Sequence, residues 1–389
     1  MDSFSIYKEL KRIESLGLRR SLRTLDSPQG GVVSVEGREL INFSSNDYLG
    51  LANHRLVKKA AIESIEKWGF GSGSSRLVSG NTALHEALEE RIRRFKDADA
   101  AIVFNSGYHA NLGVIGALAD RGTDVFSDRL NHASIVDACV LSRGNVLRYR
   151  HGDTGSLERM LRKSKAKKRL IVTDSVFSMD GDIAPIDEIA GLLDRYDAML
   201  FVDDAHATGV LGKNGRGGLE HFSIKKHPSI IEMGTLGKSV GAFGAFVAGS
   251  VELIGFLKSR SRPFIYTTAL PPCVAAASIK AFDVMEENPG LRLRLKENSE
   301  ALRRGLNERG LYTLDSSTQI IPVLTGGVHK TMEISRLLFE KGLFIQGIRP
   351  PTVPAGTARL RLSAHALHTG QDIKKAVTLI KEAIDGSAP

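Results

Sequence analysis

The sequence has 389 residues, 42% of them hydrophobic and 25% charged, and carries a formal net charge of +9 at neutral pH. This length is too great for one small domain and suits two or three packed subdomains of a globular protein. Two cysteines in unrelated contexts, no zinc-type Cys/His spacing and no long apolar run argue against a disulfide framework, a metal site and a membrane span.

The N-terminal segment, residues 1–20, lacks the continuous apolar stretch of a secretory signal, so a cytoplasmic location is expected. Its apolar residues recur at roughly helical spacing and predict a short amphipathic helix, packed on the body of the protein or on a partner subunit. These apolar residues are Phe4, Ile6, Leu10, Ile13 and Leu16.

Helical and strand patterns then alternate along the chain, which predicts βαβ units and a mostly parallel sheet of the α/β class, flanked by helices. The predicted helices cover residues 82–96, 111–118 and 186–196, and the predicted strands cover residues 100–104, 169–173, 199–202, 230–233 and 245–247. Ligands of such sheets bind beyond the carboxyl ends of the strands, and polar clusters follow several of these strands directly.

The densest run of positive charge, RKSKAKKR at residues 162–169, precedes one of these strands, where a solvated loop is expected. No aromatic residues interleave with it, so stacking on single-stranded nucleic acid is disfavoured. We therefore expect neither a nucleic-acid nor a membrane partner. A positive rim would suit coenzyme A or an acidic carrier protein.

The pattern changes near the segment EENPG at residues 286–290. Beyond it, the sequence predicts helices over residues 291–309 and 331–341, strands over residues 320–324 and 359–363, and a final helix, which indicate a smaller α+β domain. We thus expect an N-terminal extension over residues 1–45, a large domain over residues 46–287 and a small C-terminal domain over residues 288–389.

The segment FVDDAHATGVLG at residues 201–212 places Asp203 at a strand end and His206 three residues later. A partly buried carboxylate needs a cationic partner, which a protonated pyridine nitrogen would supply. Taken alone, the pair is also compatible with a helix cap or with two metal ligands.

Lys238 follows the next strand in a glycine-rich loop, within EMGTLGKSVGAFG at residues 232–244. The phosphate-binding loop pattern GxxxxGK[ST] would require glycine at position 232, where this chain has glutamate, so that alternative fails. Small neighbours leave room for a bulky ring, and a lysine enclosed in this way can act as a Schiff-base nucleophile.

Asp203 and Lys238 close successive strands and are therefore expected to face each other at one end of the sheet. An aspartate for the pyridine nitrogen and a lysine for the aldehyde is the arrangement that pyridoxal phosphate needs. The sequence thus predicts this cofactor.

Two further segments would complete the pocket. In FNSGYHAN at residues 104–111, a helix start offers N–H groups that can bind phosphate, and the candidates are Ser106, Gly107 and Tyr108. In DRLNHAS at residues 128–134, the flat ring of His132 could stack on the pyridine.

With these residues assembled, the chain resembles the α-oxoamine synthase family of fold-type I pyridoxal-phosphate enzymes over nearly its whole length. The segments that carry the resemblance are NDYLGL (46–51), GSGSSRLVSGN (71–81), SVFSMDGD (175–182), VDDAHATGVLG (202–212), TLGKSVGAFG (235–244) and RPFIYTTALPP (262–272). The resemblance implies a transferase that joins an amino acid to an acyl thioester with loss of carbon dioxide.

The resemblance implies a role for each matched residue around the cofactor ring. Lys238 would carry the cofactor and move the proton of the substrate Cα, and Asp203 would pair with the pyridine nitrogen. His132 would stack on the ring, whereas His206 and Ser178 would contact the ring oxygen.

The resemblance also implies a shared phosphate site. Thr235 would join Gly107 and Tyr108 at the phosphate, while Thr268 and Tyr266 would reach the phosphate of the other subunit, because members of this family resemble obligate homodimers.

Three segments narrow the substrate within the family: GLRR (17–20), STQIIPVL (317–324) and GIRPPTVPAGTARLRLS (347–363). They resemble the members that condense L-alanine with pimeloyl-CoA or a pimeloyl-acyl-carrier protein in biotin biosynthesis.

Five residues are carried over to the substrate site. Arg361 is expected to bind the carboxylate of the amino acid, with Arg349 as an alternative, because a guanidinium binds carboxylates bidentately. Arg20 would meet the distal pimeloyl carboxylate, and Asn46 and Thr352 would lie near the acyl substrate.

Three alternatives remain. Sister enzymes of the family use glycine or serine with other acyl-CoA thioesters and differ only in pocket shape. A transaminase on the same fold would convert alanine to pyruvate with a keto-acid acceptor and would need no acyl-thioester channel. A nucleic-acid-binding protein, suggested by the charge alone, would leave the pairing of Asp203 with Lys238 unexplained.

Overall fold

The computed structural model describes residues 5–387, and its internal contacts divide the chain into two units. The large unit comprises residues 49–178 and 182–293, and the small unit comprises the chain up to residue 48, residues 179–181 and the chain from residue 294. The chain thus passes from the large to the small unit at residues 293–294, and its N-terminal segment groups with the C-terminal part.

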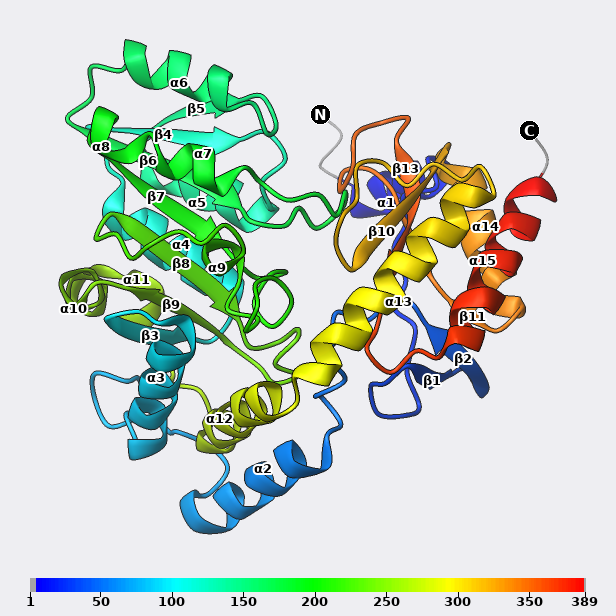
Figure 1. Cartoon of the computed structure of the whole chain (residues 1–389), viewed down its shortest axis with the longest axis horizontal. Coiled ribbons are helices and arrows are strands. Elements are labelled where there is room, and N and C mark those ends of the chain that lie inside the picture. The colour runs from blue at the N-terminus through cyan, green and yellow to red at the C-terminus, as the bar shows by residue number, and fades with distance from the viewer. Residues whose placement is uncertain (1–4, 388–389) are drawn as a thin grey trace. The chain divides into compact units, whose positions relative to one another are not determined.

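A seven-stranded sheet forms the centre of the large unit (Figure 1). Its spatial order is β3 (Ala100–Phe104), β9 (Ala245–Gly249), β8 (Ile230–Thr235), β7 (Ala198–Asp203), β6 (Lys168–Asp174), β4 (Thr123–Asp128) and β5 (Asn145–Tyr149). Strands β8, β7, β6, β4 and β5 run parallel, and only the pairs that involve β9 are antiparallel. The predicted mostly parallel sheet is confirmed.

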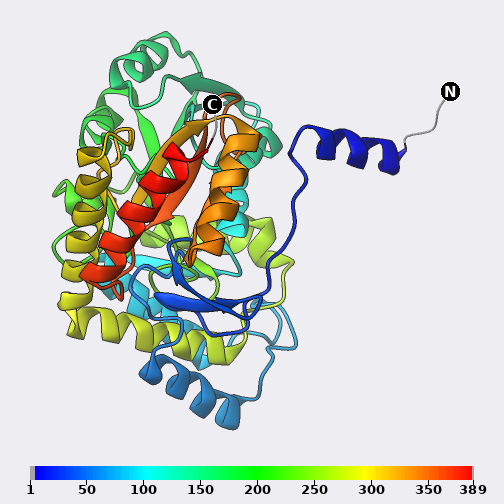
Figure 2. The same cartoon turned by 90° about the vertical axis from the view of Figure 1, so that its right-hand side faces the viewer.

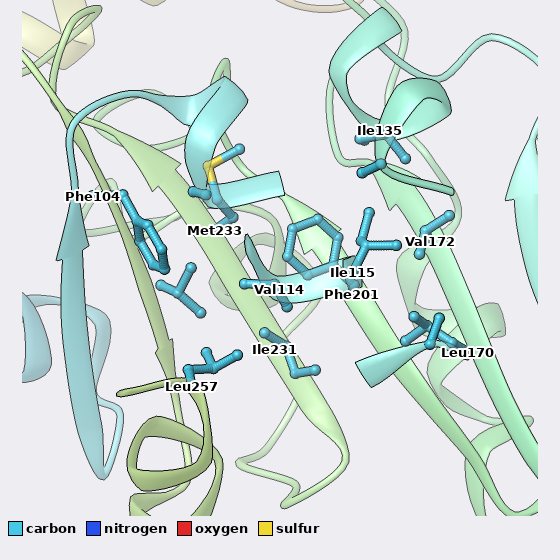
Figure 3. Packing of buried hydrophobic residues seen from close by; sticks show 14 of the residues in the cluster. Phe104, Val114, Ile115, Ile135, Leu170, Val172, Phe201, Ile231, Met233 and Leu257 are labelled. Atoms are coloured by element: carbon cyan, nitrogen blue, oxygen red, sulfur yellow. The ribbon is translucent and has the colours of Figure 1, made fainter. Parts of the chain in front are cut away.

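One face of this sheet carries the main hydrophobic core of the large unit (Figure 3). Side chains of successive strand residues point to opposite faces, so Phe201 lies on this face and its neighbours Leu200 and Val202 lie on the other. The helices packed here are α4 (Gly107–Leu118), α5 (Ala133–Ser142), α10 (Val251–Arg260) and α11 (Arg262–Ile265). Burying a side chain such as Phe201 contributes about 1.5–3 kcal/mol.

The opposite face is covered by α6 (Thr154–Lys163), α7 (Ile186–Ala190) and α8 (Leu193–Tyr196). The sequence predicts one helix over residues 186–196, and this prediction is wrong in detail, since the helix is broken at Gly191–Leu192. The helix predicted from residue 111 begins four residues earlier, at Gly107, where Ser106 caps it. The remaining helices of the unit are α2 (Arg55–Trp68), α3 (Ala83–Lys96), α9 (Gly218–His221) and α12 (Pro272–Glu287).

The small unit holds two three-stranded sheets. One joins β1 (Val32–Val35) and β2 (Arg38–Asn42) to β11 (Leu343–Phe344), which explains why the N-terminal segment groups with the C-terminal part. The other has the order β10 (Ile320–Gly326), β13 (Ala358–Ser363), β12 (Gln346–Ile348).

Helices cover the second sheet of the small unit. Helices α14 (Val328–Glu340) and α15 (Gly370–Asp385) run side by side in Figure 2 and share a core with the C-terminal half of α13 (Pro289–Glu308). The N-terminal helix α1 (Ile6–Ser15) has no buried residue, so packing on the body of the small unit is not observed. Phe4 lies outside the described residues.

Candidate active site

Asp203 ends β7 and is buried, with 3% of its surface exposed. Its Oδ1 accepts a hydrogen bond from the Ala205 N–H at 2.9 Å, and its Oδ2 accepts one from the Asn111 amide at 2.9 Å. Burial raises the pKa of this carboxyl, while the Asn111 hydrogen bond and the charge of Lys238 act in the opposite direction. A carboxylate at this depth keeps its charge only with such donors and a nearby cation.

Lys238 lies three residues beyond β8, the strand that pairs in parallel with β7. It and Asp203 therefore lie at the same end of the sheet, where these strands have their carboxyl ends (the strand edge). Lys238 Nζ is 2.8 Å from Nε2 of the buried His206. The turn that holds the lysine closes with a 2.8 Å hydrogen bond from Gly241 N–H to the Lys238 carbonyl. Gly241 has a φ of +68°, and a side chain there would collide with the backbone of Leu51 and Ala52, so this position requires glycine.

His132 precedes α5, and its Nδ1 is 2.7 Å from Ser134 Oγ. Its backbone N–H donates to Asp174 Oδ2 at 2.7 Å, and Asp174 ends β6 directly opposite Asp203. Partial burial lowers the pKa of His132, which favours a neutral ring, while the residue as a whole stays exposed. A neutral, flat and accessible imidazole is suited to stacking on a planar ring.

Two residues of this network were not singled out from the sequence. Asn111 lies on α4 and donates through Nδ2 both to Asp203 and, at 2.8 Å, to Ser134 Oγ. Asp174 is fully buried, and burial together with the neighbouring Asp203 charge raises its pKa well above its usual range. Both are polar residues at positions that would otherwise be apolar, one on a buried helix face and one at a strand end, and this was the available indication in the sequence.

The expected phosphate residues lie where β3 turns into α4. Ser106 caps the helix by accepting the His109 N–H at 3.2 Å, and the first N–H groups of a helix have no partner within it. Gly107 lies against Met233, near the end of β8, and the Tyr108 hydroxyl donates to Asp137 on α5.

The remaining predicted cofactor residues also belong to the large unit. Thr235 ends β8, and its hydroxyl donates to the Gly244 carbonyl at 3.1 Å and accepts the Gly237 N–H at 3.2 Å. Ser178 lies in a turn closed by a bridge between Val176 and Ile183. Thr268 pairs with Ser75 through the backbone, and its carbonyl accepts the Asn105 amide at 2.8 Å.

These groups fit pyridoxal phosphate. A buried carboxylate in the field of a lysine can hold a cationic ring nitrogen, a helix start can hold the phosphate, and an exposed imidazole can hold the ring. The strand edge therefore supplies one group for each part of the cofactor.

The predicted carboxylate-binding arginine, Arg361, lies on β13 in the small unit and is buried. Its two terminal nitrogens are each 3.2 Å from Asn46 Oδ1, and Nη1 is 3.0 Å from Ser363 Oγ. Tyr48 Oη donates to the same Asn46 oxygen at 3.0 Å. Asn46 and Arg361 were predicted separately and are brought together here.

Arg20 and Arg349 form a second positive group in the small unit. Arg20 Nη2 donates to Thr352 Oγ1 at 3.2 Å, and Arg349 Nη2 donates to the Arg19 carbonyl at 2.6 Å. Burial, with the Arg20 charge second, lowers the pKa of Arg349, and its buried Nε has no hydrogen-bond partner among residues 5–387. No carboxylate of the described chain lies within 4.0 Å of either guanidinium. Two such cations favour an anionic ligand.

A cleft of about 660 Å³ in the large unit lies away from these residues, at the other end of β8. Lys96 and Glu232 line it, and Lys96 Nζ is 2.8 Å from Asp204 Oδ2 and 3.0 Å from Glu232 Oε1. Asp204 of this buried ion cluster directly follows Asp203 in sequence, whereas Lys238 is not among the residues that line the cleft.

Comparisons with known proteins identify the family of this chain. The model of the aminotransferase class I and II family matches residues 38–380. An 8-amino-7-oxononanoate synthase from Geobacter sulfurreducens is 52% identical over 376 residues, which cover 96% of both chains. The enzyme of the same name from Thermoanaerobacter pseudethanolicus is 48% identical and covers 96% of this chain and 94% of its own.

Solved structures show the same fold. A serine palmitoyltransferase from S. paucimobilis with a bound PLP–myriocin aldimine has a TM-score of 0.92 at 31% identity, covering 97% of this chain and 96% of its own. An 8-amino-7-oxononanoate synthase from Francisella tularensis has a TM-score of 0.77 at 31% identity, covering 89% of this chain and 98% of its own. In addition, none of the helices within residues 5–387 combines the length and apolar character that crossing a bilayer needs.

Proposed function

We propose that this chain, which belongs to the 8-amino-7-oxononanoate synthases of the class I and II aminotransferase family, condenses L-alanine with a pimeloyl thioester. The thioester is pimeloyl-CoA or a pimeloyl-acyl-carrier protein, and the products are 8-amino-7-oxononanoate, carbon dioxide and the free thiol. The pyridoxal-phosphate dependence and fold-type I architecture of this family match the site at the edge of the large sheet.

The observation that carries the substrate is the pair of arginines without a carboxylate partner. The pimeloyl group has a distal carboxylate, whereas the acetyl and palmitoyl groups that some sister enzymes transfer have none. Arg20 and Arg349, with the Thr352 hydroxyl, supply guanidinium and hydroxyl donors for such a group. A purely alkyl chain would leave the buried Arg349 without compensation, which is costly.

Bound pyridoxal phosphate supplies an aldehyde that bonds to amines and a ring that accepts electrons from the carbon next to the bound nitrogen. Asp203 would hold the negative charge that favours a protonated ring nitrogen, and Asn111 hydrogen-bonds to Asp203 at 2.9 Å. Lys238 holds the cofactor and then exchanges the proton at the alanine Cα, with His206 2.8 Å from its Nζ as a proton partner.

Arg361 binds the alanine carboxylate in this proposal. A guanidinium fixed by Asn46 and Ser363 presents a defined pair of N–H groups, so it orients the carboxylate as well as neutralising it. A carboxylate held in one orientation would also be positioned for its loss as carbon dioxide.

We also propose that the chain works as a homodimer in which Thr268 and Tyr266 reach the partner's phosphate. Tyr266, Val78 and Phe70 are strongly exposed apolar or aromatic residues of the large unit, and such residues mark contact surfaces. Light scattering of the purified protein tests this proposal, because a monomer at micromolar concentration would contradict it.

The decisive experiment compares acyl donors of equal length with and without the distal carboxylate. Purified enzyme with pyridoxal phosphate and L-alanine should release thiol from pimeloyl-CoA at least tenfold more efficiently than from heptanoyl-CoA. Arg20→Gln should reduce this preference by lowering the rate with pimeloyl-CoA only. The exposed Arg309→Gln is the matched control.

Glycine and L-serine replace L-alanine in parallel reactions. Release that depends on glycine or serine rather than alanine would assign the chain to a sister activity of the fold, which the serine palmitoyltransferase structures make the second candidate. Equal rates with pimeloyl-CoA and heptanoyl-CoA would overturn the role of the arginine pair.

A further inference from the structure

His151 lies just beyond β5 and is held between two carboxylates of the large unit. Its Nδ1 is 3.0 Å from Asp128 Oδ1, and its Nε2 is 2.8 Å from Asp182 Oδ2. The ring also packs edge-on against Phe177, with the ring centres 4.4 Å apart at an angle of 89°. Only 28% of the side chain is exposed, so the ring is fixed from several sides.

Each carboxylate belongs to a loop that presents a cofactor residue. Asp128 ends β4 four residues before His132, and its oxygens also accept the N–H groups of Leu130 at 2.8 Å and Gly152 at 3.0 Å. Asp182 lies in the turn that contains Ser178, and its carbonyl accepts the Phe177 N–H at 3.1 Å. The His151 ring therefore links the loops that follow three neighbouring strands, β4, β5 and β6.

The two contacts require a charged ring. A neutral imidazole carries one N–H and can donate to only one carboxylate, whereas an imidazolium donates to both. Burial disfavours this charge, but the hydrogen bonds and charges of Asp128 and Asp182 outweigh it and raise the pKa of His151 to about 10. At neutral pH the ring thus forms two charge-assisted hydrogen bonds, which are about twice as strong as neutral ones.

We propose that His151 is a positioning residue of the cofactor site. As an imidazolium it ties the loop that presents His132 to the turn that presents Ser178, and so fixes the stacking ring and the hydroxyl relative to the strand edge. His151 itself contacts neither group and takes no part in the chemistry.

The test is cofactor binding measured without substrate, so it stands apart from the assignment of alanine and pimeloyl thioester. His151→Gln should weaken pyridoxal-phosphate binding by the cofactor-free protein roughly tenfold, the change expected from losing charge-assisted contacts. The visible circular dichroism of the bound cofactor should weaken as well, because that band reports how rigidly the ring is held.

His227 provides a matched control, since its side chain is 29% exposed and its Nε2 is 3.1 Å from a single carboxylate, Asp194. His227→Gln should change the melting temperature by about as much as an ordinary surface substitution does. Cofactor binding and the dichroic band should stay as in the wild type. Asp182→Asn, which changes charge but not shape, should reproduce the His151→Gln effect. The double variant should be no weaker than either single variant, because both remove the same contact.

A binding constant within twofold of the wild type and an unchanged dichroic band in His151→Gln would overturn the proposal, even if the melting temperature fell. If His151→Gln does not fold, Asp182→Asn decides in the same way. Normal binding in Asp182→Asn would show that the link does not position the site.

Discussion

Asp174 and Asp203 stand opposite each other as register partners at the ends of β6 and β7. Two buried carboxylates side by side repel each other, and each is stabilised by a donor from a different element: the His132 backbone N–H for Asp174 and the Asn111 amide for Asp203. The carboxyl ends of these strands therefore concentrate negative charge, which Lys238 and, in the proposed enzyme, the protonated ring nitrogen of bound pyridoxal phosphate would balance. Removing either donor should weaken the site more than removing an ordinary surface contact.

Asn111→Ala should weaken pyridoxal-phosphate binding and destabilise the protein by about 1–3 kcal/mol, because it leaves a buried carboxylate short of one donor. The same change should raise the pKa of Asp203 further, since the Asn111 hydrogen bond lowers it. Fluorescence titration with the cofactor measures the change in binding, and urea unfolding measures the change in stability. Asn145→Ala, which removes an exposed bond to Asp124, is the control. Equal behaviour of the two variants would contradict the role of Asn111.

The sequence predicts the architecture well because the strands of the large sheet are short apolar runs bounded by polar or glycine-rich segments. β3 has the predicted bounds, and β7, β8 and β9 are each two residues longer than predicted. β4 and β5 were missed, since charged and polar residues such as Asp124, Asp128 and Arg148 interrupt their apolar pattern. β3 also lies at an edge of the sheet but is an uninterrupted apolar run, so the charged residues within β4 and β5, rather than their position, hid them.

Most of the predicted cofactor residues, such as Asp203, Lys238 and Ser106, lie just after a strand or at a helix start, so sequence order alone could place them near one another. The contacts between Arg361 and Asn46, and the cluster of His151, Asp128 and Asp182, join residues tens or hundreds of positions apart. No periodicity reports such pairs, and only the folded chain brings them together.

Arg361→Lys should raise the KM for L-alanine about 10- to 100-fold, because a lysine keeps the charge but loses the planar pair of donors. Cofactor binding and its visible absorbance should not change. Steady-state kinetics with varied alanine at saturating pimeloyl-CoA measures the effect. Arg303→Lys, which alters a half-buried guanidinium that donates to the Thr318 carbonyl, is the control. An unchanged KM in Arg361→Lys would assign the alanine carboxylate to another residue.

Stability should fall in weak acid because of two buried histidines in the small unit. Burial, with the His368 charge second, lowers the pKa of His365 to about 3, and burial lowers the pKa of His368 to about 4. In the unfolded chain both groups titrate near pH 6.5, so below that pH the unfolded state binds more protons and is favoured. Each histidine should lower the free energy of unfolding by about 1.4 kcal/mol per pH unit as the pH falls from about 6 to its pKa in the folded protein.

Urea unfolding at pH 7 and pH 5 measures this loss. His365→Gln should flatten the dependence on pH, because it removes one of the two titrating groups, whereas substitution of the exposed His329 should leave the slope as in the wild type. A His365→Gln slope equal to that of the wild type would show that other groups, such as buried carboxylates, govern the acid sensitivity.

The buried ion cluster of Lys96, Asp204 and Glu232 should be essential for the stability of the protein rather than for its chemistry. Lys96 is fully buried and neutralises Asp204 and Glu232, and burial raises the pKa of Glu232 to about 7 despite the lysine charge. Lys96→Met should therefore destabilise the protein by about 3–5 kcal/mol, because it leaves two buried carboxylates without a cation. Lys96→Met combined with Glu232→Gln should recover part of the loss, since one of those charges is then gone.

Lys168→Met, which breaks an exposed pair with Asp120, should have little effect on the urea midpoint. If the Lys96→Met midpoint matched that of Lys168→Met, the buried cluster would contribute no more to stability than a surface ion pair.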